Sequence, residues 1–407
     1  MPIASLGGRY YVTASPSTHG APVRINDNIS NETQALYDRW FIDGLAPVYR
    51  EQGRRASTWM PAVLMACTLY GEAYLQRFER WCLPSLLGRE NLNALFERSI
   101  IVLFTDAASY LALVSMIRPL RARGLDVRLV EMPPYIEADL GQPNGKYRAL
   151  GTAQNIGLQM AARWGVGFHM LQPDHVYPPK YFHNLSRLAN DHPAIVQTGL
   201  SAHLGRAFHD IERYRQADDT LVIPSDELGA IGFRHMHQQM RCLTMTEPGV
   251  DLENMPIGSW VGWAGRDAYT IHSPHANIVW LSPELTQRAP SSVPENIDTQ
   301  APWLMPDGAY VVTPEDEMGF IELSADEKAH CAIRQPWQSY ATAVWDGIKF
   351  HDEYLPFLRA TCRVAIGERN EGWTNAAIDA QATDLIERTV AFKPVAMQEW
   401  IERARAA

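Results

Sequence analysis

Short apolar runs alternate with stretches of helical spacing in the first half of the chain. The apolar runs are rich in Val, Ile and Leu, which is typical of strands buried on both faces. They cover residues 62–68, 99–105, 126–132 and 166–171. The helical stretches between them cover residues 72–87, 107–123 and 146–164. This repetition predicts an α/β fold with a Rossmann-like, mostly parallel sheet flanked by helices.

The pattern is less regular after residue 190. A helix is expected over residues 226–242, and short strands over residues 194–200, 259–264, 268–272, 277–281, 309–313 and 319–323. Helical spacing dominates from residue 325 onward. We therefore divide the chain into an N-terminal extension (residues 1–58), an α/β domain (59–325) and a helical C-terminal segment (326–407).

Composition narrows the class of protein. The chain has 407 residues, of which 46% are hydrophobic and 20% charged, as in an ordinary globular protein. The net charge of −10 argues against a partner that is a nucleic acid, because phosphate binding needs an excess of Lys and Arg. The five cysteines are scattered without a CxxC pair, which favours reduced thiols in a cytoplasmic protein. No apolar run approaches the roughly 20 residues of a membrane helix, so we expect membrane contact to be peripheral at most.

Polar residues follow several of the predicted strands. Thr68 and Tyr70 follow the first, Asp106 the second, and Gln172 and Asp174 the fourth. Ligands of parallel sheets bind outside the carboxyl ends of the strands, so these residues are expected to share one cleft. Two acids there suit a ligand with hydroxyl and phosphate groups, one accepting ribose or base hydrogen bonds and the other holding a divalent cation. The alternative for each acid is a helix cap or turn.

The helix predicted over residues 146–164 has a polar row. Its members are Arg148, Thr152, Asn155 and Gln159, opposite an apolar row. One interpretation is a solvated face. The other is that the start of the helix turns Lys146, Arg148 and Asn155 toward the cleft, where cations would bind a diphosphate.

The order of these segments resembles that of glycosyltransferases with the GT-A fold. The block from Ala153 through Gly157 and Gly165 to Asp174 is similar to the central block of that family, which reads A-R-N-x-G, an apolar strand and D-x-D. Residues 64–87 are similar to its opening strand and helix, and residues 100–106 to its second strand with a terminal acid. The similarity covers roughly residues 60–185. It implies a nucleotide-sugar donor, UDP- or GDP-linked, and an acceptor that is a carbohydrate or another hydroxyl compound.

The D-x-D of the family aligns with Gln172-Pro173-Asp174, so only the second acid is present. The resemblance implies that Asp174 contacts Mg²⁺ or Mn²⁺, which one carboxylate and two diphosphate oxygens can hold because these ions keep several waters. His175 and His272 are further candidate metal ligands. The alternative is an enzyme that needs no metal ion.

Inverting glycosyl transfer also needs a general base for the acceptor hydroxyl. Residues 224–228 precede a helical run and resemble the position of the family's base, which makes Asp226 and Glu227 the catalytic candidates. Both acids are equally suited to the first turn of a helix, where negative charge is favourable.

Other functions stay open at this point. The loss of the first D of D-x-D favours a non-catalytic nucleotide- or carbohydrate-binding module derived from a transferase. A nucleotidyltransferase is less favoured, because no Gly-rich basic loop follows the first strand. A zinc hydrolase lacks a ligand motif such as H-E-x-x-H. The sequence leaves open the donor, the acceptor, the stereochemistry and the oligomeric state, with a homo-oligomer as one option.

Overall fold

The computed structural model describes most of the chain from residue 63 onward. The described residues are 63–96, 99–132, 145–245, 252–256, 258, 260–275, 277–289, 304–305, 308–325, 334–367 and 374–406, without the side chains of residues 95–96, 146–148 and 404–406. The predicted N-terminal extension, residues 1–58, lies outside them, so that prediction is not tested.

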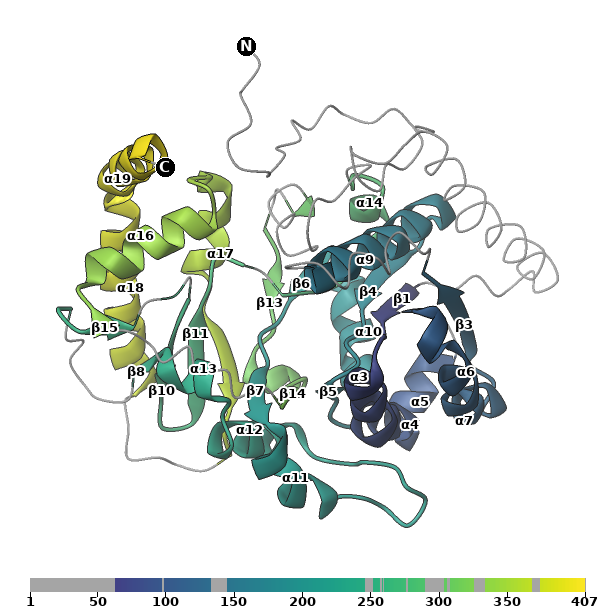
Figure 1. Cartoon of the computed structure of the whole chain (residues 1–407). Coiled ribbons are helices and arrows are strands. Elements are labelled where there is room, and N and C mark those ends of the chain that lie inside the picture. The colour runs from purple at the N-terminus through teal and green to yellow at the C-terminus, as the bar shows by residue number, and fades with distance from the viewer. Residues whose placement is uncertain are drawn as a thin grey trace.

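A seven-stranded sheet forms the centre of the fold (Figure 1). Its order is β3 (Asp126–Glu131), β2 (Ser99–Thr105), β1 (Val63–Thr68), β4 (Gly167–Met170), β12 (Ile278–Leu281), β6 (Ala194–Val196) and β13 (Tyr310–Val311). All neighbouring strands are parallel except β12, which runs antiparallel to β4 and β6. The predicted fold class, a mostly parallel sheet flanked by helices, is confirmed.

Helices cover both faces of this sheet. On one face the apolar side of α9 (Gly145–Trp164) packs against β1, β2 and β4. Gly157 allows the close approach, since a Cβ at this position would lie 2.6 Å from the Cβ of Ala66. The other face is covered by α3 (Glu72–Arg77), the π-helical turn η2 (Phe78–Cys82), α4 (Leu83–Leu87), α5 (Arg89–Phe96), α6 (Ala107–Met116), α7 (Arg118–Ala122) and α10 (Tyr181–Asp191).

Two of the expected long helices are divided. The helix predicted over residues 107–123 turns at Ile117 and forms α6 and α7. The helix predicted over residues 226–242 forms α12 (Ser225–Arg234) and α13 (Gln238–Cys242). The first break is explained by Pro119, which lies in the first turn of α7. A proline is tolerated there, whereas inside one continuous helix it would interrupt the backbone hydrogen bonds.

Smaller sheets extend the fold beyond the central one. In the three-stranded sheet, β14 (Ile321–Ser324) lies between β5 (His175–Val176) and β7 (Leu200–His203). The four-stranded sheet has the order β16 (Cys362–Ala365), β11 (Ala268–His272), β10 (Val261–Ala264) and β8 (Thr244–Met245). A two-stranded sheet pairs β15 (Arg334–Gln335) with β9 (Met255–Pro256). The described residues before 325 also form α11 (Leu204–Glu212), α14 (Pro283–Thr286) and the 3₁₀ turn η4 (Pro314–Asp316).

The C-terminal segment is mainly helical, as expected. It contains α16 (Trp337–Gly347), the 3₁₀ turn η5 (Asp352–Tyr354), α17 (Leu355–Arg359), α18 (Asn375–Ala391) and α19 (Lys393–Ala406). Helices α16, α18 and α19 gather on the side of the molecule opposite α6 and α7 (Figure 1). The segment also supplies β16, which pairs with β11 of the preceding domain. Among the described residues no helix combines the length and apolar character that crossing a membrane requires.

Candidate functional site

The loops that follow β1 and β2 are joined at the carboxyl edge of the central sheet. The backbone N–H of Leu69 donates to the carbonyl of Phe104 (2.8 Å), and the N–H of Gly71 donates to Oγ of Ser109 (3.2 Å). Gly71 has a φ of 74°, a conformation that glycine adopts without a Cβ penalty. Thr68 is buried and Tyr70 half-buried beside this turn. The two predicted donor-binding positions therefore lie where the first two strand ends meet.

Asp106 caps helix α6. Its Oδ1 accepts the backbone N–H of Ser109 at 2.9 Å, and its backbone is extended, as expected of an N-cap. Ser109 thus links the cap to the Gly71 turn. The cap uses only one carboxylate oxygen of Asp106, Oδ1. The predicted contact of Asp106 with a nucleotide is compatible with the cap and stays a prediction.

The fourth strand brings its polar residues to the same edge. The N–H of Leu171 donates to the carbonyl of Ala66 on β1 (2.9 Å). Gln172 is fixed by its backbone, since its N–H donates to the Tyr177 hydroxyl (3.3 Å) and its carbonyl accepts the Cys82 thiol (3.4 Å). The carbonyl of Asp174 accepts the N–H of Leu323 on β14 at 2.8 Å. The backbone around Gln172 and Asp174 is therefore held from three elements.

The side chain of Asp174 faces a cation and a second acid. Its Oδ2 lies 3.8 Å from Nη1 of Arg77 at the end of α3, and the two side chains are only 13% and 10% exposed. Glu322 on β14, paired in register with His175, interacts electrostatically with both. The Arg77 guanidinium also lies over the Tyr74 ring, 5.0 Å from its centroid. One guanidinium and two carboxylates thus share a largely buried position.

Burial raises the pKa of Asp174 to about 7, the negative charge of Glu322 adds to the increase, and the Arg77 guanidinium opposes it. The pKa of Glu322 is raised by burial as well, again opposed by Arg77. Two carboxylates compete for one cation, so ionising both is unfavourable near neutral pH.

This cluster predicts a specific dependence of stability on pH. The folded state holds the Asp174 proton up to about pH 7, whereas an unfolded aspartate releases it near 3.8. Between these values the folded state binds more protons, so its stability falls as the pH rises. We expect Asp174→Asn to gain stability relative to the wild-type chain between pH 5 and pH 8, by on the order of 2 kcal/mol. Urea denaturation with EDTA at both pH values measures the difference.

The same experiment has an internal control. His169 and His175 are buried, and burial lowers their pKa values to about 4 and about 3. Their contribution is lost as the pH falls below about 6.5, but it is present in both proteins and cancels in the comparison. A difference between the two proteins that stays constant from pH 5 to pH 8 contradicts the prediction.

The candidate metal ligands are not brought together. His175 stacks on Phe320, with ring centroids 4.3 Å apart and an interplanar angle of 22°. His272 lies on β11 in the four-stranded sheet, where its Nδ1 donates to the carbonyl of Leu358 (3.2 Å) and its ring packs edge-on to Trp263. Within the described part of the chain, no three His, Cys, Asp or Glu side chains gather closely enough to hold a metal ion. The residues present therefore do not fit the Mg²⁺ or Mn²⁺ site implied by the resemblance, because neither histidine joins Asp174 and the Arg77 guanidinium already lies beside that acid.

Two members of the polar row on α9 do not face solvent. Asn155 is 1% exposed and Gln159 is also buried. Among the described residues, neither the amide nitrogen nor the amide oxygen of Asn155 has a hydrogen-bond partner. The side chains of Lys146 and Arg148, in the first turn of α9, lie outside the described residues. Their proposed contact with a diphosphate stays a prediction.

The two candidate bases occupy the first turn of α12. Both side chains are exposed, and Oδ1 of Asp226 accepts the backbone N–H of Glu227 (2.9 Å). Oε2 of Glu227 accepts the Tyr214 hydroxyl at 3.0 Å. The preceding Ser225 fixes the start of the helix, because its Oγ accepts the N–H of Gly319 at 2.8 Å, next to the Phe320 that stacks on His175. The start of α12 is thereby tied to the loop that leads into β14.

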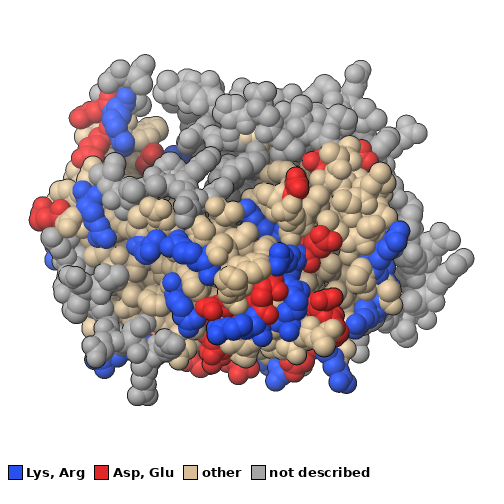
Figure 2. All heavy atoms as spheres, turned by 60° about the horizontal axis from the view of Figure 1, so that its bottom comes forward, with Lys and Arg blue, Asp and Glu red and all other residues tan. Residues whose placement is uncertain are grey.

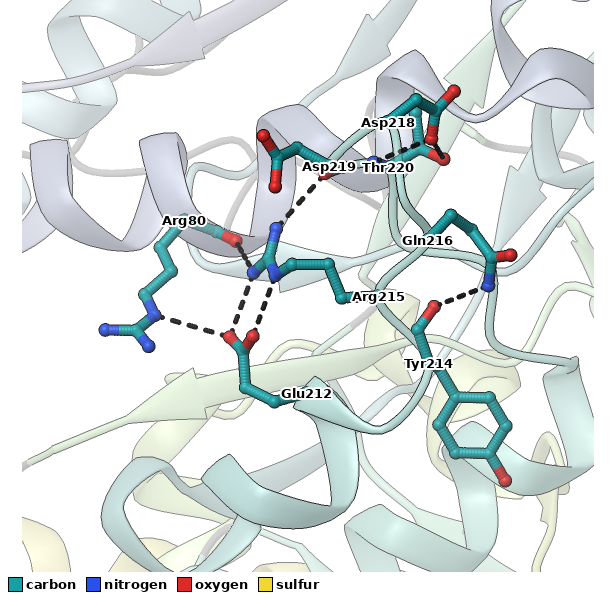
Figure 3. A network of polar contacts seen from close by, with 8 residues as sticks. All are labelled: Arg80, Glu212, Tyr214, Arg215, Gln216, Asp218, Asp219 and Thr220. Carbon is teal, nitrogen blue, oxygen red and sulfur yellow. Dashed lines mark hydrogen bonds and ion pairs between the residues drawn. The ribbon is translucent and has the colours of Figure 1, made fainter.

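An ion-pair network holds the loop that carries Tyr214. Arg215 donates to both oxygens of Glu212 and to the carbonyls of Arg80 and Asp219, and Arg80 donates to Glu212 as well (Figure 3). The Tyr214 ring extends away from this network (Figure 3). On the face that carries the network, Lys and Arg side chains are interspersed with Asp and Glu (Figure 2). The network fixes the loop to η2 and so positions the Tyr214 hydroxyl beside Glu227.

Two residues of the cluster, Arg77 and Glu322, were not among the sequence candidates. Glu322 had a detectable signal, since it is the one charged residue in the otherwise apolar run predicted as a strand over residues 319–323. Arg77 had none, because one arginine in an amphipathic helix is ordinarily solvated.

Comparisons with known proteins find only distant structural likeness. No protein-family model matches the chain, and no curated protein matches it in sequence. Among solved structures, mouse Xyloside xylosyltransferase 1 in its apo form is 9% identical, over 38% of this chain and 58% of that chain, with a TM-score of 0.22. S. aureus TarS is 10% identical, over 72% of this chain and 40% of TarS, with a TM-score of 0.29. TarS 1-349 is also 10% identical, over 72% and 70%, with a TM-score of 0.30.

The chain thus spans 58% of the mouse protein and 40% of the longer TarS chain. The mostly parallel α/β sheet is the fold class that the resemblance to GT-A glycosyltransferases implies. Similarity of this extent carries no argument about donor, acceptor or catalytic residues.

Proposed function

We propose that this chain transfers a sugar from a nucleotide-sugar donor to a hydroxyl group of an acceptor. The observation that carries the proposal is the meeting of three strand ends at one edge of the parallel sheet. Gly71, in the turn after β1, donates to Ser109 at the start of α6, which follows β2, and Leu171, directly after β4, donates to Ala66 within β1. This edge is where parallel sheets bind nucleotides, and the sequence there resembles that of GT-A glycosyltransferases.

The donor binds along these loops. Thr68, Tyr70 and Asp106 contact the nucleoside of a UDP- or GDP-linked sugar, and Gln172 lies nearer the sugar. Lys146 and Arg148 are assigned to the diphosphate because they belong to the first turn of α9, and the N-terminus of a helix favours an anion. Asn155 is an additional candidate because its buried amide has no partner in the structure.

The acceptor approaches from the side of α12. We assign Asp226 as the general base that removes the proton of the attacking hydroxyl, and Glu227 as the alternative. Glu227 is the less favoured of the two because its Oε2 already accepts the Tyr214 hydroxyl. The acceptor is a carbohydrate or another compound with a free hydroxyl group.

A non-catalytic nucleotide- or carbohydrate-binding module is the second candidate. The observation in its favour is the pairing of Asp174 with Arg77, since the acid that aligns with D-x-D is already engaged. Such a module binds a nucleotide sugar without transferring or hydrolysing it.

Nucleotide binding separates these possibilities from unrelated functions. We expect one of UDP-, GDP-, CMP- or dTDP-linked sugars to stabilise the protein by about 2.7 kcal/mol at a concentration of 100 times Kd. Thr68→Val removes one hydroxyl at the strand end and is expected to weaken that binding by about tenfold. Differential scanning fluorimetry and calorimetry measure both effects.

Thr270→Val is the matched control, because Thr270 is a buried strand threonine of the four-stranded sheet. It leaves binding unchanged if the site lies at the central sheet. Absence of stabilisation by all four classes of donor overturns the proposal. Binding without transfer or slow hydrolysis of the donor supports the binding module instead.

A further inference from the structure

Arg77 lies beside the Asp174 carboxylate in a largely buried position. The guanidinium nitrogen lies 3.8 Å from Oδ2, and at 10% exposure Arg77 is held between Tyr74 and the acid rather than extending into solvent. Arg77 belongs to α3, directly after the first strand, and Asp174 belongs to the turn after the fourth. The contact therefore crosses the middle of the strand-end edge.

With the Arg77 guanidinium in place, the cluster needs one further positive charge to be neutral, not two. Arg77 contributes one positive charge against Asp174 and Glu322, which contribute one negative charge each when ionised. A divalent ion at the same carboxylate would lie beside the guanidinium in a largely buried position, where repulsion between like charges is strong. A single proton shared by the two acids is enough to neutralise the remaining charge.

The other residues that would be needed to hold a metal ion are engaged elsewhere. His175 stacks on Phe320, and His272 belongs to a different sheet. In the parts of the chain that the structure covers, Asp174 and Glu322 have no third His, Cys, Asp or Glu near enough to complete a ligand group. The residues around Asp174 therefore differ from the metal site implied by the resemblance. The physical cause is the guanidinium of Arg77, which lies 3.8 Å from Oδ2 of Asp174.

We propose that Arg77 replaces the divalent cation at Asp174, so that this chain binds its nucleotide-sugar donor without Mg²⁺ or Mn²⁺. The part that concerns the donor rests on the proposed function. The part that concerns the cation does not, because it follows from the contact between Arg77 and Asp174 alone. Arg77 is a positioning residue: its guanidinium neutralises Asp174 and fixes the turn after the fourth strand.

Manganese binding to the protein alone tests the cation part. Calorimetric and electron paramagnetic resonance titrations with Mn²⁺ at pH 8, where Asp174 is mostly ionised, are expected to show wild-type binding weaker than about 1 mM. Arg77→Ala frees the two acids and is expected to bind Mn²⁺ at least about tenfold more tightly. Adding Asp174→Asn to that variant removes the gain.

Arg77→Lys keeps the positive charge and serves as the matched control, with no gain in Mn²⁺ binding. If Arg77→Ala does not fold, Arg77→Gln and the wild-type titration carry the test. Wild-type binding of Mn²⁺ below about 100 μM that is lost in Asp174→Asn overturns the proposal. Unaltered Mn²⁺ binding in folded Arg77→Ala and Arg77→Gln overturns it as well.

Donor binding in EDTA tests the second part. The Kd of the nucleotide sugar that stabilises the protein is expected to change by less than about twofold between EDTA and 1 mM Mn²⁺. A requirement for Mn²⁺ contradicts metal independence while leaving the proposed function intact. If no nucleotide sugar binds under either condition, the proposed function fails, and the Mn²⁺ titration still decides the role of Arg77.

Discussion

Replacing Asp226 by asparagine lowers kcat/KM of sugar transfer by about 10²- to 10⁴-fold, the range expected when a general base is removed. The carboxylate lies at the start of α12, which Ser225 ties to the loop before β14. The substitution keeps the size of the side chain and its hydrogen bond to the N–H of Glu227, so the helix itself is preserved. Initial rates with the donor identified by thermal shift measure the loss.

Glu227→Gln is the paired variant, with an expected loss of less than about tenfold, because Glu227 is already bonded to Tyr214 and the amide oxygen can accept the same hydroxyl. The donor Kd stays unchanged in both variants, which separates catalysis from binding. A larger loss in Glu227→Gln than in Asp226→Asn reverses the assignment. Full activity in both variants excludes the first turn of α12 as the source of the base.

Gly229→Ala produces the largest expected loss of stability, at about 3 kcal/mol or more. A Cβ at this position of α12 would lie 1.6 Å from the carbonyl oxygen of Ala365 on β16, and backbone cannot turn aside as a side chain can. Relief requires α12 to move away from the four-stranded sheet. Because α12 carries Asp226, sugar transfer is expected to decrease together with the midpoint of chemical denaturation.

Gly205→Ala is the matched control, since Gly205 is also helical and a Cβ there would meet only the His203 side chain, at 3.3 Å. Its stability is expected to stay within about 1 kcal/mol of the wild-type value. Equal melting temperatures for Gly229→Ala and the wild-type chain would show that α12 and β16 are not packed as described.

The early strands were predictable from the sequence because each is a short, continuous apolar run, which is the pattern of a strand buried on both faces. The run from Ser99 to Thr105 forms a strand with the predicted bounds and is buried throughout. Likewise, α9 begins within one residue of its predicted start. In parallel α/β units, the hydrophobic pattern of each segment already indicates its place in the sheet or in a flanking helix. Periodicity therefore suffices to predict the elements and the sheet edge at which we expect ligands to bind.

Features that depend on distant partners were not predictable. The direction of β12 in the central sheet is set by the path of the chain through the four-stranded sheet, which leaves no trace in the apolar run itself. The burial of Asn155 could not be predicted, because it depends on segments distant in the sequence that cover this side of α9. The pairing of Arg77 with Asp174 joins residues from two strand ends, and spacing along one helix carries no information about it.

The pairing of β16 with β11 has a consequence for the order of folding. The register joins Ala268 to Ala365 and Ile271 to Cys362, so this edge of the four-stranded sheet forms only after residue 365 has left the ribosome. Contacts of such long sequence separation form slowly, because loop closure must precede them. The helix with Asp226 packs on β16, so β1, β2 and β4, whose ends form the proposed nucleotide site, are synthesised well before the acid that we assign as the base is set in place.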